Sequence, residues 1–167
     1  MSKREILLLG DENLYKVSVP IQKENLNIAK QVIDDLHDTI VTFKEKFGFG
    51  RAIAAPQIDE AYRIVYMHLG DEQHHFINPV LEPIGDEVFK LWDDCMSFPG
   101  LEVYLERYRK VKLTYKNLNW EDCEMFFEGD LSELIQHEYD HLDGVLSVHR
   151  VIDKNGFRIN KDKSGTF

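Results

Sequence analysis

The chain has 167 residues, with a hydrophobic fraction of 43% and a charged fraction of 30%, which are typical of a globular protein. Its net charge of −10 and pI of about 5.1 argue against direct nucleic-acid binding, which needs a basic surface patch. No apolar run is long enough to cross a membrane, and residues 1–11 lack the apolar core of a signal peptide, so we expect a cytoplasmic protein. We also expect one domain over residues 1–167, with a flexible tail from about residue 154.

The first predicted elements are an extended arm and a helix. The arm covers residues 6–20, and we expect its apolar side chains to anchor it to the core. Between residues 24 and 47 apolar side chains repeat at the helical period until Gly48, which predicts an amphipathic helix. His37 on this helix lies among acidic neighbours, so we expect it to face solvent.

The middle of the chain predicts short strands. Gly48–Gln57 is rich in glycine and small residues, and it fits either a connector or a loop that brings backbone close to a ligand. Residues 62–69 and a run around residues 76–77 predict a hairpin, broken by the prolines that follow. Further strands are expected at residues 87–92, 110–115, 124–127 and 145–148. Helix, strands and a second helix indicate an α+β fold.

The second helix is predicted over residues 130–144, DLSELIQHEYDHLDG. Asp130 is suited to cap the free N–H groups of the first turn, and Glu133 three residues later completes a capping box. Gly144 suits the left-handed turn that ends a helix.

A metal-binding pattern lies inside this helix. His137 and His141 are four residues apart, so their rings project from one face and can hold one metal ion. Glu138 lies between them, where its carboxylate can accept a proton from a water bound to that metal. The alternative is that both are ordinary surface histidines. The predicted cap, the four-residue spacing and the intervening glutamate argue against this alternative.

A catalytic metal usually has three protein ligands, so a third must be found. Ser147 occupies the position where a metzincin protease places its third histidine, and His149 falls two residues late. No glutamate follows His141, which argues against a thermolysin-like site. We therefore expect the third ligand upstream.

The upstream candidates are Cys95, Cys123, His68, His74 and His75. Cys95 is favoured because it follows a predicted strand in a loop rich in Ser, Pro and Gly, where site residues concentrate. Cys123 is flanked by acidic residues, and we expect it to be a thiol without a ligand role. A disulfide between the two cysteines is not expected in a chain without a secretion signal.

Three motifs together make the chain resemble the peptide deformylases over nearly its whole length. The first motif of that family, a glycine-rich segment ending Ala-Ala-Pro-Gln, is similar to Gly50–Gln57. The second, usually Glu-Gly-Cys-Leu-Ser, is similar to Asp93–Ser97, and the third, HExDH, to His137–His141. The resemblance implies a deformylase fold, in which antiparallel or mixed strands pack around the central HExxH helix.

The resemblance also implies a site. The metal ligands would be Cys95, His137 and His141, holding ferrous iron natively and often zinc or nickel as isolated. Its substrate channel would be lined by Gly50, Ala52, Ile53, Asp93 and Asp94. The chain departs from the family in two motifs, since Ala52 replaces a glycine and Asp93-Asp94 replace Glu-Gly, and both changes bear on substrate preference and rate. The family's pairing of an acid with an arginine is expected between Asp93 and Arg107, with Arg109 as the alternative.

The implied reaction removes the formyl group from the N-terminal formylmethionine of new polypeptides and releases formate. Glu138 would act as the base, while the Gln57 side chain and the Met96 backbone N–H would stabilise the oxyanion. The alternatives are action on another N-acyl amide, a weakly active metal-binding homologue, or a structural metal. The expected partners are N-formylated nascent peptides, without ribosome association, because the chain lacks a basic C-terminal helix.

Overall fold

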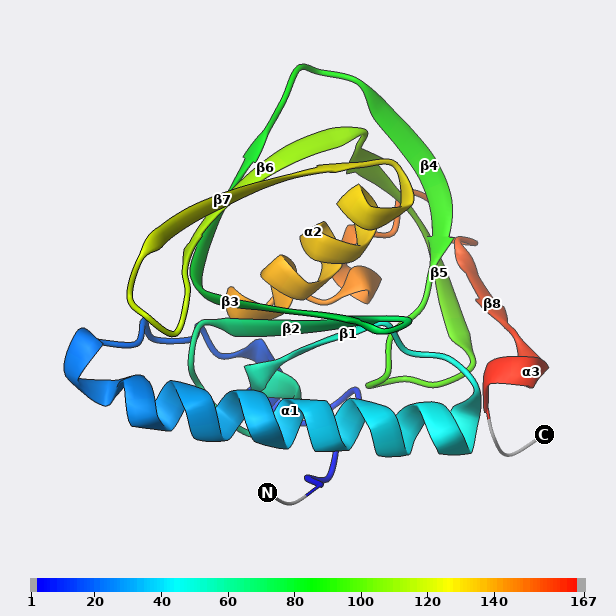
Figure 1. Cartoon of the computed structure of the whole chain (residues 1–167). Helices are drawn as coiled ribbons and strands as arrows, with labels where there is room; N and C mark the ends of the chain where they lie inside the picture. Colours follow the sequence, from blue (N-terminus) through cyan, green and yellow to red (C-terminus); the bar gives the residue numbers. More distant parts are fainter. Residues whose placement is uncertain (1–2, 165–167) are drawn as a thin grey trace.

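The computed structural model describes residues 3–164, which form two antiparallel sheets around one helix (Figure 1). The first sheet has five strands in the order β1-β2-β3-β6-β7, which are Ala52–Ala54, Ile64–Leu69, Glu72–Pro83, Lys110–Lys116 and Asp122–Glu128. The second sheet has the order β4-β5-β8, which are Val88–Asp93, Leu101–Tyr108 and Phe157–Ile159. The helices are α1 (Leu26–Phe47), α2 (Asp130–Leu142) and the short α3 (Lys161–Ser164). The expected α+β fold with antiparallel strands around a central helix is confirmed.

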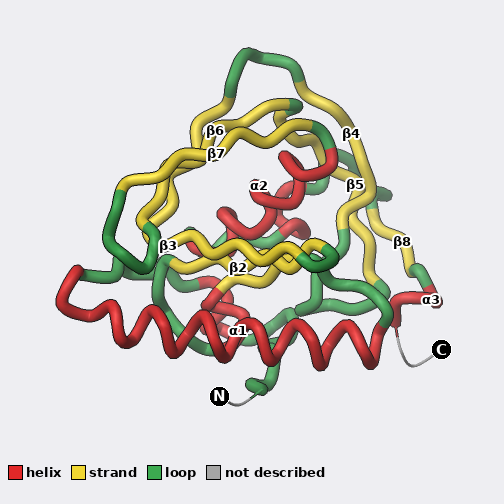
Figure 2. The backbone as a smooth tube through the Cα atoms, viewed as in Figure 1, coloured by secondary structure: helices red, strands yellow, loops and turns green. Residues whose placement is uncertain are grey.

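Helix α2 lies inside the fold, and α1 lies outside it. In Figure 2 the strands surround α2, while α1 runs along the outer side of β2 and β3. Leu134, Ile135 and Leu142 of α2 pack in one core cluster with apolar residues of β1, β2, β3, β6 and β7. Because this face of α2 is apolar and buried, its remaining buried polar residues are fixed in position within the interior.

Helix α1 forms close to the predicted residues. It begins at Leu26, after a 3₁₀ turn, and ends at Phe47, just before Gly48 as the sequence predicts, and Gly48 has a left-handed φ of 76°. The expectation for His37 is wrong, because it is half-buried and its Nδ1 lies 2.7 Å from the hydroxyl of Tyr66. The acidic neighbours of His37 in the sequence give no information about Tyr66, which β2 brings next to the His37 ring. In the part of the chain that the structure describes, no helix is long and apolar enough to cross a membrane.

Several strands differ from the prediction. β1, β5 and β8 were not predicted as strands, although β5 is the centre of the second sheet. β3 continues through Asn78-Pro79, where the sequence predicts a break, because the pairing with β6 shifts between Ile77 and Val80. A bulge of this kind frees Pro79 from donating a ladder hydrogen bond, so the strand tolerates it.

Two segments near the C-terminal end also differ from the predictions. Residues expected to form a last strand at 145–148 instead enter the 3₁₀ helix Ser147–Arg150. The tail expected to be flexible from residue 154 contains β8, which pairs with β5 through Leu101↔Ile159 and Val103↔Phe157. Its last residues, 165–167, lie outside the described part of the chain.

The N-terminal arm is attached through its backbone and through some of its apolar side chains. Leu14 is fully buried, whereas the exposed apolar residues of the arm are Leu8, Leu9, Val17 and Val19. The Leu7 N–H donates to Gln57 O at 2.8 Å, and the Leu9 N–H donates to Ser97 O at 2.9 Å. The expected anchoring by apolar side chains is confirmed for Ile6, Leu7 and Leu14, which pack against the core, but not for the four exposed residues.

We expect Asn78→Ala to destabilise the fold by about 2 kcal/mol, measured by urea unfolding. Asn78 has a φ of 50°, a conformation that Asn tolerates better than Ala, and its amide makes two hydrogen bonds of 2.8 Å to the backbone of Ile21. The control is Asn119→Ala at an exposed position, which should change the free energy of unfolding by less than about 0.5 kcal/mol. Equal effects of the two variants would contradict this account.

Candidate functional site

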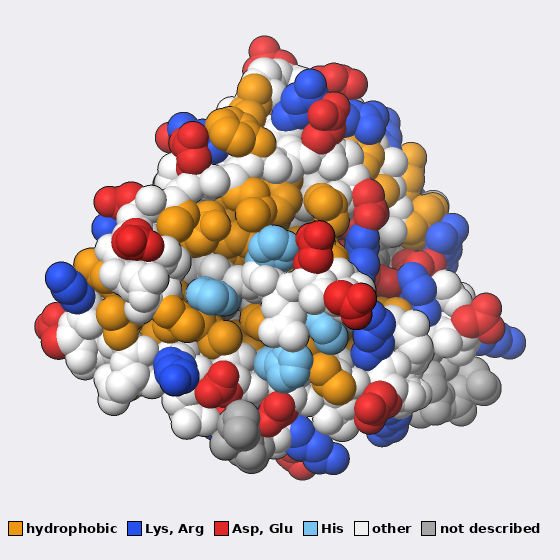
Figure 3. All heavy atoms as spheres, viewed as in Figure 1, with side chains coloured by type: hydrophobic (Ala, Val, Ile, Leu, Met, Phe, Trp, Pro, Cys, Tyr) orange, Lys and Arg blue, Asp and Glu red, His pale blue; other side chains and the backbone are white. Residues whose placement is uncertain are grey.

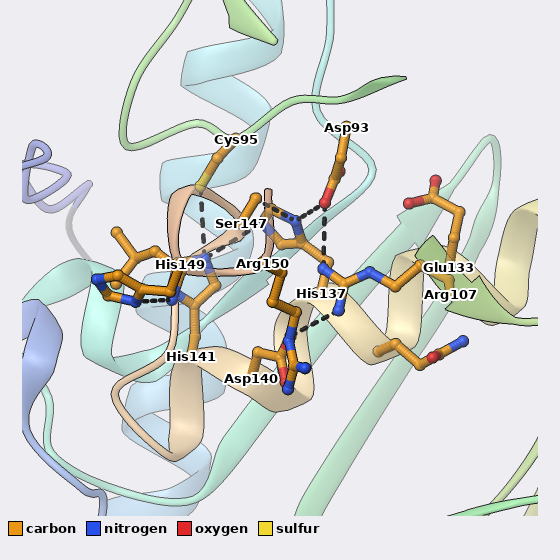
Figure 4. A network of polar contacts seen from close by, with 12 residues as sticks. Asp93, Cys95, Arg107, Glu133, His137, Asp140, His141, Ser147, His149 and Arg150 are labelled. Atoms are coloured by element: carbon orange, nitrogen blue, oxygen red, sulfur yellow. Dashed lines mark hydrogen bonds and ion pairs between the residues drawn. The ribbon is translucent and has the colours of Figure 1, made fainter. Parts of the chain in front are cut away.

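The structure brings Cys95, His137 and His141 together beside α2. The two histidines are one turn apart, are 5% and 0% exposed, and have their Nε2 atoms 3.3 Å apart. Cys95 follows β4, and its Sγ lies 3.4 Å from His141 Nε2 (Figure 4). One donor atom from each residue lies within 4.8 Å of the others, so the group could hold a single metal ion. A thiolate and two imidazoles suit zinc or iron, so these residues fit a metal of the kind that the resemblance implies.

The other candidate ligands lie elsewhere. Among the described residues, the group that could hold a metal contains none of Cys123, His68, His74 or His75. Cys95 and Cys123 are both free, as the sequence predicts, and Cys123 is half-exposed on β7.

A buried network of ion pairs fixes the orientation of His137. Asp93 Oδ2 lies 2.8 Å from His137 Nδ1 and accepts a hydrogen bond of 3.2 Å from Arg107 Nη2. Arg107 Nη1 donates to Asp140 at 2.6 Å, and Arg150 donates to both oxygens of Asp140 (Figure 4). The expected pairing of Asp93 with Arg107 is confirmed, whereas Arg109 lies 3.5 Å from Glu87 and contacts the ring of Phe89.

Burial and neighbouring charges set the pKa values of the network. Burial opposes ionisation of Asp93, but His137 and Arg107 hold its pKa at about 2. Burial likewise opposes the charged form of His137, yet Asp93 and Cys95 raise the pKa of His137 well above its usual value. Burial and the charge of His137 lower the pKa of His141. Asp93 and His137 thus favour each other's charged forms, whereas burial and the charge of His137 favour the neutral form of His141.

Glu138 lies deep in the same site. It is 3% exposed, and its Oε2 has no hydrogen-bond partner in the described part of the chain. Burial raises the pKa of Glu138 to about 7, an effect that the charge of His137 partly opposes. A carboxylate with a free oxygen and a pKa near neutrality is suited to accept and return a proton.

A hydrogen bond from the backbone orients the side chain of Gln57 toward Cys95. Its Oε1 accepts a hydrogen bond from the Ala54 N–H at 2.9 Å, so its Nε2 points to Ser97 Oγ at 3.1 Å and to Cys95 Sγ at 3.6 Å. The N–H of Met96 makes no hydrogen bond with any described residue. The Gln57 side chain thus places one N–H donor beside Cys95, and the Met96 backbone, next in the chain, provides another.

These elements surround a cavity of about 400 Å³. Its walls include the predicted residues Gly50, Ala52, Asp93, Asp94, Cys95, Met96, His137 and Glu138. Ile53 does not line this cavity, because it is fully buried in the core cluster beneath α1. A volume of this size is typical of sites for small ligands.

Comparison with known proteins shows which family the chain belongs to. The model of the polypeptide deformylase family matches residues 3–156 of this chain. The chain belongs to the peptide deformylase family. A peptide deformylase of Parafrankia sp. (strain EAN1pec) is 38% identical over 152 residues, which cover 90% of this chain and 80% of that protein.

Solved structures agree with this membership. The crystal structure of peptide deformylase from Thermotoga maritima matches with a TM-score of 0.82 and 31% identity, covering 92% of this chain and all of that one. A peptide deformylase from Synechococcus elongatus in complex with actinonin has a TM-score of 0.82 and 28% identity, covering 90% of this chain and 80% of that one.

Within this deformylase fold, the first turn of α2 differs from the sequence prediction. Helix α2 begins after Gly129, and the Asp130 side chain makes no capping hydrogen bond. Asp130 and Glu133 instead accept hydrogen bonds from Arg51, so the predicted capping box is wrong, while Gly144 has the predicted left-handed φ of 72°. Burial, together with Asp93, raises the pKa of Glu133 to about 7, and His137 and Arg51 oppose this.

Residues that the sequence did not single out also line the cavity, and they are Lys44, Phe49, Arg51, Glu133, Leu134 and Lys163. Arg51 lies inside the first motif and could have been noticed there as a charged residue among small ones. No sequence pattern indicated that Lys163 would line the cavity, because its position depends on the pairing of β8 with β5.

We expect Arg107→Met to destabilise the protein by about 3–5 kcal/mol and to lower its metal content, measured by thermal unfolding and elemental analysis. The substitution leaves Asp93 and Asp140 without their shared buried cation, and Asp93 then orients His137 less well. Arg109→Met is the matched control, because its ion pair with Glu87 is exposed and should contribute less than about 1 kcal/mol. Full metal content in Arg107→Met would disprove the orienting role of this network.

Proposed function

We propose that this chain, acting as a single catalytic domain, removes the formyl group from the N-terminal formylmethionine of newly synthesised polypeptides. The observation that carries the proposal is that Glu138 lines one cavity with Cys95 and His137, which form a possible metal-binding group together with His141. Family membership supports the same reaction, because the relatives with known names are peptide deformylases. The products are formate and a free N-terminal amine.

Cys95, His137 and His141 would hold one divalent ion, and we propose ferrous iron in the cell, with zinc or nickel in protein isolated in air. When bound, the ion supplies a Lewis acid that polarises the formyl carbonyl and increases the acidity of water. The contact between Asp93 and His137 Nδ1 directs His137 Nε2 toward the other two donor atoms.

Glu138 moves the proton. Its carboxylate takes a proton from the attacking water, and the oxygen of that water forms a bond to the formyl carbon. The same carboxyl group then gives the proton to the amine nitrogen as the bond between carbon and nitrogen breaks. The pKa of about 7, raised by burial, suits both directions of transfer near neutral pH.

Gln57 and Met96 stabilise the charge that develops on the formyl oxygen. Gln57 Nε2 is held near Cys95 by the hydrogen bond between Gln57 Oε1 and the Ala54 N–H, and the Met96 N–H follows Cys95 directly in the chain. Donors that are fixed before the reaction stabilise an oxyanion without a cost of reorganisation.

We expect Glu138→Gln to lower kcat by about 100- to 10,000-fold while metal content stays at the wild-type level, because the amide cannot accept the proton. The measurement is formate release from formyl-Met-Ala-Ser, combined with elemental analysis. Glu128→Gln is the control, since Glu128 is exposed at the end of β7 and should leave the rate unchanged. A wild-type rate in Glu138→Gln would refute the role assigned to this residue.

We expect protein loaded anaerobically with ferrous iron to be active and to lose its activity in air, whereas zinc- or nickel-loaded protein is stable in air. Oxidation of the ion or of the Cys95 thiolate would remove a ligand or the ion itself. Formate release over time, measured in sealed and open vessels, tests this expectation. Equal stability of all three forms in air would argue against iron as the native ion.

We further propose that the chain acts on nascent peptides in the cytoplasm without binding the ribosome or nucleic acid directly. Figure 3 shows one face on which Lys and Arg side chains are interspersed with Asp and Glu, rather than gathered into one basic patch. The net charge of −10 supports the same proposal, because binding to phosphates requires an excess of positive charge.

A further inference from the structure

The C-terminal segment contributes a cation to the wall of the cavity that Cys95 and Glu138 line. β8 pairs with β5, and the Asn160 N–H donates to Gly100 O at 2.7 Å, so the chain is held against the second sheet as far as α3 (Figure 1). Lys163 lies on α3 and lines the same cavity. A residue near the C-terminal end of the chain is therefore part of the site.

Three groups surround the ammonium of Lys163. Its Nζ lies 2.5 Å from Asp94 Oδ2, 3.5 Å from Glu102 Oε2 and 5.7 Å from the centre of the Phe49 ring. Burial opposes the charged form of Lys163, but Asp94 and Glu102 raise its pKa above the ordinary value, so it remains a cation. Asp94 and Phe49 also line the cavity, so Lys163 contacts two of its walls.

Asp94 occupies a position where an unpaired negative charge would affect the reaction. It directly precedes Cys95, and it lies two residues before Met96, whose N–H stabilises the oxyanion in the proposed mechanism. It also stands where the second motif of the family usually has a glycine. A carboxylate beside the reacting groups opposes the negative charge that develops on the formyl oxygen.

Most carboxylates that line the cavity are paired with cations. Four acidic residues line it, and three of them form the ion pairs Asp93–Arg107, Glu133–Arg51 and Asp94–Lys163. Among the described residues, the fourth, Glu138, forms no ion pair, and its Oε2 has no hydrogen-bond partner. The pairing thus sets the proposed base apart from the other carboxylates around it.

The pair of Asp94 with Lys163 is partly open to solvent. The two side chains are 31% and 33% exposed, so the pair should add little to the stability of the fold. The charge of Asp94 also acts on Arg51, but the guanidinium of Arg51 donates to Asp130 and Glu133 instead. Lys163 is therefore the cation that holds Asp94, and its effect on the reaction can be separated from its effect on folding.

We propose that Lys163 is a positioning residue for the reaction, which holds the Asp94 carboxylate against the C-terminal segment and offsets its negative charge in the cavity. The inference rests on the proposed deformylase reaction and adds a residue that acts on it through Asp94. Loss of the Lys163 cation slows the step in which negative charge develops, and it has little effect on the binding of an uncharged peptide.

The experiment measures formate release by the iron-loaded full chain from formyl-Met-Ala-Ser with an amidated C-terminus, which is an uncharged substrate. In Lys163→Met we expect kcat to fall by about 3- to 10-fold at low salt, while KM stays within about twofold of the wild-type value. The deficit should shrink as NaCl rises from about 20 to about 500 mM, because salt screens the exposed charge of Asp94. Lys163→Arg keeps the cation and should retain the wild-type kcat.

A double variant tests whether Lys163 acts through Asp94. In the Asp94→Asn background the negative charge is already absent, so the further change Lys163→Met should alter kcat by less than about twofold. Arg158→Met is the matched control, because Arg158 ties the same segment to Glu102 at 2.8 Å but does not line the cavity. It also removes one positive charge, and it should leave kcat and its salt dependence unchanged.

The outcomes separate the two proposals. Absence of formate release by the wild-type protein would overturn the proposed function and this inference with it. Release by the wild type together with an unchanged kcat in Lys163→Met would leave the function standing and overturn the role of Lys163. A loss of rate in Lys163→Met that neither salt nor Asp94→Asn relieves, or that Arg158→Met reproduces, would show a merely structural tie and overturn that role as well.

Discussion

Arg107 lies between two buried carboxylates, Asp93 at the end of β4 and Asp140 on α2, and it is 4% exposed. A cation in this position offsets the cost of burying both negative charges, and it ties the second sheet to the central helix. Asp93 in turn contacts His137, so the direction of a ring in the site depends on an arginine two contacts away. Apolar packing of α2 and this network act together, since the first buries the helix and the second orients His137 within the site.

The parts of the site that could be predicted from sequence are those that local geometry determines. The i, i+4 spacing of His137 and His141 places both rings on one face whatever the surrounding fold is. Similarly, both helices end just before the predicted glycines, Gly48 and Gly144, and Gly144 has the left-handed backbone that the sequence predicts. The prediction of Cys95 as a ligand was less direct, because it rested on its loop setting, on elimination of other ligands and on the family resemblance rather than on local geometry.

The parts that could not be predicted depend on contacts between distant segments. Asp130 and Glu133 have the residue types and spacing of a capping box, yet Arg51, about 80 positions earlier, binds both of them. A long-range ion pair of this kind leaves no local pattern in the sequence. The same holds for β8, whose Phe157–Ile159 has no strand signal of its own and is ordered by pairing with β5.

The N-terminal arm joins two segments that lie far apart in the sequence. Ser18 N–H donates to Leu142 O at 2.8 Å, and a Cβ on Gly144 would lie 2.3 Å from Tyr15 O, so the arm packs tightly against the end of α2. Residues 15–18 thus pack against residues 142–144, which follow them by more than 120 positions. Because a contact of such sequence separation must close a long loop, it makes folding slower than a contact between neighbouring segments would.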